Sequence, residues 1–340
     1  MKNSKSKNLV RILLAVLCIF LLVAPFITNN YIKRIMTTIF IYTLLSMGNM
    51  LISGHTGMLN MGHSAFWGTG AYISAILMTA YGMPFWAGFI LAGIGAGITG
   101  LLVSIPCLRL ETDFLSLITT AFQYIFLTIV RNWMSVTRGP MGITAIPEIE
   151  LFGFKFNSPI RYYYLMLVVA ILSYIVMNNI VNSKYGRAMQ ATRDDEIGAR
   201  SVGVRTDSVK ILVFVIGTVF AGFAGSLYAS YIGFISPSNF VYDQSLTFMQ
   251  MDIIGGLGSL PGALVGTVFF VLMPEIIRPL AVYRVGVGGL IMIAFMLFRP
   301  QGILGSHAFA TSSGLQEKIK QRIIEKRLKK NSASTGGQKA

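Results

Sequence analysis

The sequence predicts an all-α, polytopic integral membrane protein with about ten transmembrane or partly re-entrant helices. Three observations support this class: 54% of the 340 residues are hydrophobic, only 12% are charged, and the mean hydropathy is +0.66. Soluble domains usually contain about 25% charged residues. The apolar residues also gather in runs close to the roughly 20 residues that a helix needs to cross a bilayer. Repeated membrane crossings therefore account for the length of the chain.

The apolar runs predict the crossings in order along the chain. They fall at residues 9–27, 35–52, 64–80, 84–106, 114–130, 162–181, 211–229, 245–258, 261–277 and 283–298. The first run is long for the core of a signal peptide and no small-x-small cleavage site follows it, so we interpret it as an uncleaved span. Segment 245–258 is the weakest, because it is short and carries polar residues. It is a candidate for a broken or re-entrant helix.

Lysine and arginine set the expected orientation. With a cytoplasmic N-terminus and all ten crossings, 20 of the 28 Lys and Arg residues lie on the inside. The positive-inside rule then favours both termini in the cytoplasm, provided that the number of crossings is even. The net charge of +15 follows loops and tails rather than one folded polar surface, which argues against a nucleic-acid partner.

Residues 1–298 are expected to form the membrane domain and residues 299–340 a basic cytoplasmic tail. In LQEKIKQRIIEKRLKK, residues 315–330, apolar residues recur at helical spacing among many cations. This pattern is typical of an amphipathic helix on anionic lipids, and a solvated helix without a partner is the alternative. Residues 331–340, NSASTGGQKA, are expected to be disordered.

A polar and highly charged segment interrupts the apolar runs at residues 182–210, NSKYGRAMQATRDDEIGARSVGVRTDSVK, and we call it the charged loop. Asn182 or Ser183 is suited to cap a short helix outside the membrane, and Gly186 and Gly203 bracket its middle. Small residues in this helix permit close approach of another surface. The loop presents charges of both signs on Arg187, Arg193, Asp194, Asp195, Glu196 and Arg200. From the residues alone, a docking surface and a solvated connector both remain open.

Two glycine-rich blocks interrupt the apolar pattern, one in each half of the chain. Non-helical backbone at membrane depth is tolerated only inside protein or beside water, so both blocks are candidate walls of a translocation path. The alternative is that the glycines only let helices pack closely. The candidate residues are Gly54, Gly57, Asn60, Gly62, His63, Gly255, Gly256 and Gly258.

Asp252 is the acidic residue ranked first for such a path. Ionisable groups at membrane depth are costly and are usually paired or functional. Its partner would be a cationic group of a solute or a side chain such as Arg131. His55 and His63 have no acidic residue or cysteine near them in the sequence, so we expect no metal site.

The stretch GRAMQATRDDEIGARSVGV in the charged loop resembles the cytoplasmic loop of permease subunits of branched-chain amino acid ABC importers. Further blocks similar to that family occur in the family's order: SGHTGMLNMGHSAFWGTGAYISAIL, PCLRLETDFLSLITTAF, GFISPSNF, DIIGGLGSLPGALVGTVFF, PEIIR and RPQGILG. The resemblance implies an ABC importer permease-like fold. It also implies ATP-driven translocation of branched-chain or hydrophobic amino acids by alternating access.

In such importers the cytoplasmic loop inserts into a groove on the ATPase. The resemblance gives this coupling role to Gly186, Arg187, Arg193, Asp194, Asp195, Glu196, Ala199 and Gly203. It implies two cytoplasmic ABC ATPase subunits, a second permease chain in a homo- or heterodimer, an extracytoplasmic solute-binding protein and the lipids of the bacterial cytoplasmic membrane as partners. ATP and Mg²⁺ are then expected on the ATPase, with no cofactor bound by this chain.

The sequence offers no catalytic set. It contains no GxxxxGK[ST] loop to hold ATP phosphates, and HExxH, GxSxG and CxxC are absent. We therefore expect no enzymatic activity on this chain. Two alternatives to amino acid import stay open: a urea or short-amide ABC permease, and a stand-alone secondary transporter, for which broken helices and Asp252 would also serve.

Overall fold

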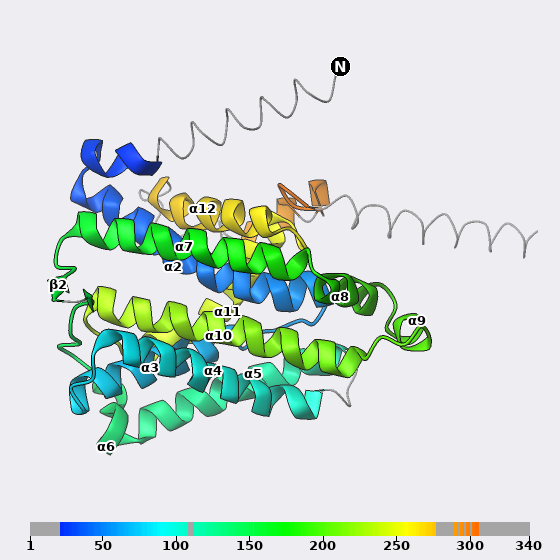
Figure 1. The fold of residues 1–340 in the computed structure, drawn as a ribbon, viewed down its shortest axis with the longest axis horizontal. Helices are drawn as coiled ribbons and strands as arrows, with labels where there is room; N and C mark the ends of the chain where they lie inside the picture. The colour runs from blue at the N-terminus through cyan, green and yellow to red at the C-terminus, as the bar shows by residue number, and fades with distance from the viewer. Residues whose placement is uncertain are drawn as a thin grey trace, which may run out of the picture.

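The computed structural model describes residues 21–107, 112–151 and 153–276, and the short stretches 289–290, 293–295, 297–299 and 301–305. These parts of the chain are almost entirely helical, as predicted (Figure 1). The predicted crossing at 283–298 and the one at 9–27 lie largely outside the described residues. The predicted amphipathic helix at 315–330 and the disordered end at 331–340 lie wholly outside them.

The helices and strands follow one another in chain order. They are α2 (Asn30–Asn49), a π-helical segment (Met50–His55), α3 (His63–Ala80), α4 (Phe85–Cys107), α5 (Thr112–Asn132), α6 (Met134–Thr137), a 3-10 turn (Gly139–Met141), β1 (Glu150–Leu151), β2 (Phe154–Lys155), α7 (Pro159–Val181), α8 (Lys184–Asp194), α9 (Glu196–Ser201), α10 (Thr206–Ile232), a second 3-10 turn (Pro237–Phe240), α11 (Tyr242–Gly255) and α12 (Leu260–Ile276).

Every predicted crossing that falls within the described parts lies on a helix. Five helical segments there are long and apolar enough to cross a membrane, namely Asn30–His55, Phe85–Pro106, Phe114–Asn132, Pro159–Val181 and Thr206–Ile232. α3 coincides with the crossing predicted at 64–80 but is not among the five. It packs against α4, α5, α10 and α11, and its Phe66 and Trp67 are fully buried. α3 is therefore an inner helix of the bundle.

α11 and α12 form one bent unit rather than the two separate crossings predicted at 245–258 and 261–277. The two helices are bent by 118° at the break between them. α11 has 14 residues, too few for a straight crossing, which needs roughly 20. The pair is therefore a broken span or a re-entrant hairpin, as the polar composition of 245–258 suggested.

The turn between α11 and α12 depends on glycine. Gly256 and Gly258 have φ values of 112° and 85°, which L side chains rarely adopt. The residues just after the predicted domain boundary at 298 close over this turn. Ile303 donates its N–H to the carbonyl of Ile254 at 2.8 Å, and Leu304 donates to that of Gly255 at 2.9 Å. Residues 301–305 thus pack on the membrane helices.

α10 is the central helix and packs against α2, α3 and α4. Glycines mark its contact points. A Cβ added at Gly217 would lie 2.6 Å from the carbonyl oxygen of Gly48, and one at Gly222 would lie 2.6 Å from that of Ala92. A Cβ added at Gly225 would lie 2.2 Å from the carbonyl oxygen of Trp67 in α3. At these helix–helix contacts the backbone of α10 lies directly against the backbones of its neighbours, as small residues allow in membrane bundles.

The connecting segments lie at the two ends of this bundle. α8 and α9 project beyond one end, whereas α6 and the β1–β2 hairpin lie at the opposite end (Figure 1). The strands are antiparallel, with Glu150 opposite Lys155. The charged loop therefore lies at one end of the apolar bundle.

Candidate functional site

The charged loop forms two short helices rather than the single helix predicted from the sequence. Ser183 caps α8, and its Oγ accepts a hydrogen bond from the N–H of Tyr185 at 3.1 Å. Asp195 has extended backbone angles (φ −157°, ψ 103°), which end α8. Its carboxylate accepts from the N–H of Gly198 at 3.0 Å and so caps α9. The break arises because a short acidic side chain satisfies the first free N–H groups of a new helix.

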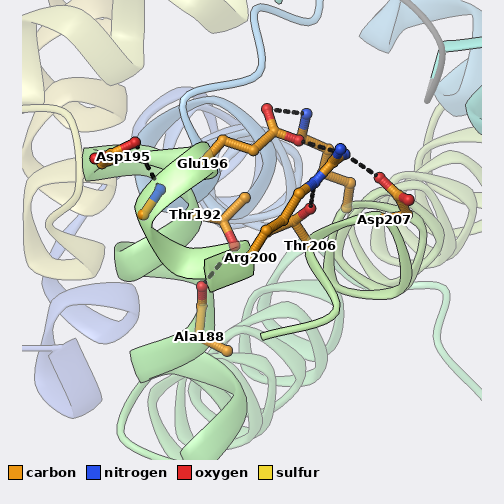
Figure 2. A network of polar contacts seen from close by, with 9 residues as sticks. Ala188, Thr192, Asp195, Glu196, Arg200, Thr206 and Asp207 are labelled. Carbon is orange, nitrogen blue, oxygen red and sulfur yellow. Dashed lines mark hydrogen bonds and ion pairs between the residues drawn. The ribbon is translucent and has the colours of Figure 1, made fainter. Parts of the chain in front are cut away.

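Figure 2 shows the polar network that fastens α9 to the start of α10. Glu196 accepts from Nζ of Lys210 at 2.7 Å and from Arg200 at 3.0 Å. Arg200 also contacts the carboxylate of Asp207 at 2.6 Å and Oγ1 of Thr206 at 2.7 Å. Burial alone would raise the pKa of Glu196. The hydrogen bond from Lys210 and the charges of Lys210 and Arg200 outweigh burial, so this pKa lies below its usual value.

The predicted coupling residues divide by exposure. Those exposed to solvent are Arg187, Asp194, Asp195 and Gly203, those buried are Gly186 and Ala199, and those half-buried are Arg193 and Glu196. Gly186 is buried against the end of α7, where an added Cβ would lie 1.8 Å from the carbonyl oxygen of Val181. Gly203 has a φ of 89° with no atom within 4 Å of its Cβ position, so its backbone conformation, not close packing, requires glycine.

Two apolar side chains of the charged loop point into solvent, and the sequence analysis gave them no role. Ile197 on α9 is 82% exposed, and Val202 just after it is 79% exposed. Aliphatic residues in an otherwise polar loop were the signal available in the sequence. Exposed apolar groups rimmed by charges are typical of protein–protein contact sites.

Arg193 links the charged loop to the first glycine-rich block. Its Nη1 donates to the carbonyl oxygen of Gly54 at 2.6 Å. A Cβ added at Gly57 would lie 3.2 Å from Cγ of Arg193, so the aliphatic part of the arginine covers that glycine. Gly54 in turn lies against the second block, since a Cβ there would lie 2.6 Å from the backbone nitrogen of Gly258. The structure thus brings together residues from both blocks and from the loop.

The other residues of the first block form a buried polar turn. Nδ2 of Asn60 lies 3.1 Å from Nδ1 of His63, and Oδ1 of Asn60 accepts from the N–H of Gly62 at 3.1 Å. Gly62 leaves no room for a side chain, because a Cβ would lie 2.2 Å from the carbonyl oxygen of Thr119. In this conformation the block is closely packed.

Asp252 is completely enclosed. Its carboxylate accepts from Oγ of Ser46 at 2.5 Å and from Nδ2 of Asn49 at 2.9 Å, and both donors lie on α2. The sequence-based suggestion of Arg131 as its partner is therefore wrong, because neutral donors of α2 occupy the carboxylate instead. Nearby, Gly255 packs directly on α12, because a Cβ added at Gly255 would lie 2.0 Å from the carbonyl oxygen of Gly262. Among the described residues no group of three or more His, Cys, Asp or Glu side chains is placed to hold a metal.

Residues 31–298 match the family model described as the permease component of branched-chain amino acid transport systems. The chain belongs to this permease family. The resemblance seen in the charged loop and in the glycine-rich blocks is thereby confirmed, as is the expectation of a multi-pass membrane protein.

Individual relatives of this permease agree with the family match. It is 32% identical to the high-affinity branched-chain amino acid transport system permease protein LivM of Escherichia coli (strain K12). The 317 aligned residues cover 86% of this chain and 75% of that relative. The high-affinity branched-chain amino acid transport system permease protein LivH of Salmonella typhimurium is 28% identical over 285 residues, which cover 78% of this chain and 91% of that relative. The autoinducer 2 import system permease protein LsrC of Yersinia enterocolitica is 26% identical over 308 residues, which cover 84% of this chain and 81% of that relative. No solved structure matches this permease.

Proposed function

We propose that this permease imports branched-chain or similar hydrophobic amino acids across the bacterial cytoplasmic membrane by alternating access, driven by ATP hydrolysis on separate subunits. The observation that carries the proposal is the 32% identity to a branched-chain amino acid permease across 86% of the chain. The sequence has no P-loop, so ATP and Mg²⁺ would be held by two cytoplasmic ABC ATPases. A second permease chain, identical or different, completes the pore, and an extracytoplasmic binding protein delivers the solute.

In this proposal the charged loop is the surface that the ATPase contacts. The loop projects beyond the bundle and exposes Ile197 and Val202 beside the charges of Arg187, Asp194 and Asp195. The network around Glu196 ties α9 to α10, while α8 packs against α7 and α10. ATPase closure would therefore move α7 and α10 directly.

The two glycine-rich blocks and Asp252 are the proposed boundary of the solute path. Their close packing corresponds to a closed state, in which Gly54 lies against Gly258 and Asp252 is enclosed by α2. We take α11 and α12 as a re-entrant hairpin, which keeps the number of crossings even and places the charged loop and both termini in the cytoplasm. On this reading α6 and the β1–β2 hairpin would face the binding protein. The basic tail would lie on the inner lipid surface.

The test is uptake of radiolabelled leucine into proteoliposomes that contain the permease, its ATPase subunits and its binding protein. Uptake is expected only when every subunit and internal ATP are present. Uptake by the permease alone under a proton or sodium gradient would instead establish a secondary transporter. ATP-driven uptake of urea but not of leucine would reassign the solute while leaving the ATP-driven mechanism in place.

A further inference from the structure

Besides the ends of α7 and α10, the charged loop has another connection to the membrane domain. Arg193, near the end of α8, reaches a segment 139 residues away in the chain and donates from Nη1 to the carbonyl oxygen of Gly54 at 2.6 Å. Hydrogen bonds from a charged donor are stronger than those between neutral groups. The arginine side chain also lies over Gly57, whose φ of 72° and missing side chain leave room for it.

The segment that Arg193 holds is itself irregular. Met50–His55 continues α2 as a π-helical segment, and Gly57 follows in the left-handed region. π-helical turns inside longer helices are rare and frequently occur at functional sites. The irregular end of α2 is thus the part that Arg193 contacts.

The contact continues from Gly54 to the break between α11 and α12. The Cβ position of Gly54 lies 2.6 Å from the backbone nitrogen of Gly258, so the two backbones touch. The same nitrogen donates to Sδ of Met50 at 3.2 Å. An unbroken series of contacts therefore runs from α8 through Arg193 and Gly54 to Gly258. The side chain of Met50 lies beside this contact, with its Sδ 2.5 Å from the Cβ position of Gly54, and the backbones of the two glycines meet directly.

We propose that Arg193 is a positioning residue that transmits movement of the charged loop to both glycine-rich blocks at once. This inference rests on the proposed function and adds a third route to those through α7 and α10. The first two routes move straight helices, whereas this one moves the non-helical backbone proposed to bound the solute path. Arg193 therefore determines how much solute is moved for each ATP hydrolysed.

The test uses the reconstituted transporter with its ATPases and binding protein. Arg193→Met keeps the aliphatic cover over Gly57 but lacks the donor, and Arg193→Lys retains a positive charge and donors on a shorter side chain. Arg34→Met is the matched control, because Arg34 is an exposed arginine near the start of α2 and lies outside the charged loop. Leucine uptake and ATP hydrolysis stimulated by the loaded binding protein are measured on the same vesicles.

Loss of one charge-assisted hydrogen bond predicts that Arg193→Met lowers uptake per ATP by about tenfold. ATP hydrolysis should remain near the parent rate, Arg193→Lys should be intermediate, and Arg34→Met should match the parent. Parent-like uptake per ATP in Arg193→Met would overturn the inference and leave the proposed function intact. Equal loss of hydrolysis and uptake in both Arg193 variants, with the complex still assembled, would also overturn it. Absence of ATP-driven uptake by the parent would refute the proposed function itself.

Discussion

Replacing Ile197 with serine is expected to weaken ATPase binding without changing the fold of the permease. Ile197 is 82% exposed on α9, so its side chain contributes little to the stability of the isolated chain. Covering an exposed isoleucine contributes about 1.5–3 kcal/mol, which leaves about 1.2–2.5 kcal/mol after scaling by the exposed fraction. At about 1.4 kcal/mol for each factor of ten, Ile197→Ser should raise the dissociation constant roughly sevenfold to sixtyfold.

The assay is titration of the purified ATPase onto immobilised, detergent-solubilised permease at a fixed salt concentration. Met141→Ser is the matched control. Met141 is 83% exposed and lies in the connection after α6, at the end of the bundle away from the charged loop. Its variant should bind the ATPase like the parent. Parent-like binding by Ile197→Ser, or equal weakening in both variants, would show that α9 is not the contact surface.

Three further outcomes are expected. The pKa of Glu196 is lowered in the folded protein, so its ion pair with Lys210 is fully present above the usual value of about 4.3 and is lost as the pH falls through the lowered value. Proteolysis of the charged loop should therefore accelerate only at acidic pH in the parent, whereas Glu196→Gln should be cleaved readily at neutral pH. Gly222→Leu should lower the melting temperature in detergent, because α4 and Gly70 fill the space around Gly222 and overpacking costs about 1–3 kcal/mol. An unchanged melting temperature would contradict the close packing of α10 against α4. Asp252→Ala should destabilise by about 1–3 kcal/mol, since it leaves buried donors of α2 unsatisfied, and a greater loss in Asp252→Asn would contradict this account.

Within the described residues, hydropathy and charge were sufficient to predict the five long apolar helices and the place of the charged loop along the chain. Both depend on composition over a window of residues, so a short polar stretch such as 182–210 stands out between apolar runs. The cap at Ser183 and the irregular turn at 256–259 were also readable, because serine and glycine have strong local preferences.

The contacts that join these elements could not be predicted from local pattern. Arg193 and Gly54 are 139 residues apart, and Asp252 and Ser46 are 206 apart. No periodicity in a single sequence relates such positions. The split of the charged loop at Asp195 was missed for a different reason. Its aspartate was counted as a surface charge, although the same side chain serves equally well as a helix cap.

The glycines of α10 limit the ways in which the bundle can rearrange. Gly217, Gly222 and Gly225 sit where the backbones of three neighbouring helices touch α10. Turning α10 by one residue position, roughly 100°, would drive a bulky side chain such as Ile216 or Phe223 into one of those backbones. Rolling of α10 is thereby blocked, so a rearrangement would have to carry the contacting parts of α2, α3 and α4 along with α10. Hinges that permit such a movement must then lie outside these contacts, among the helices that surround them.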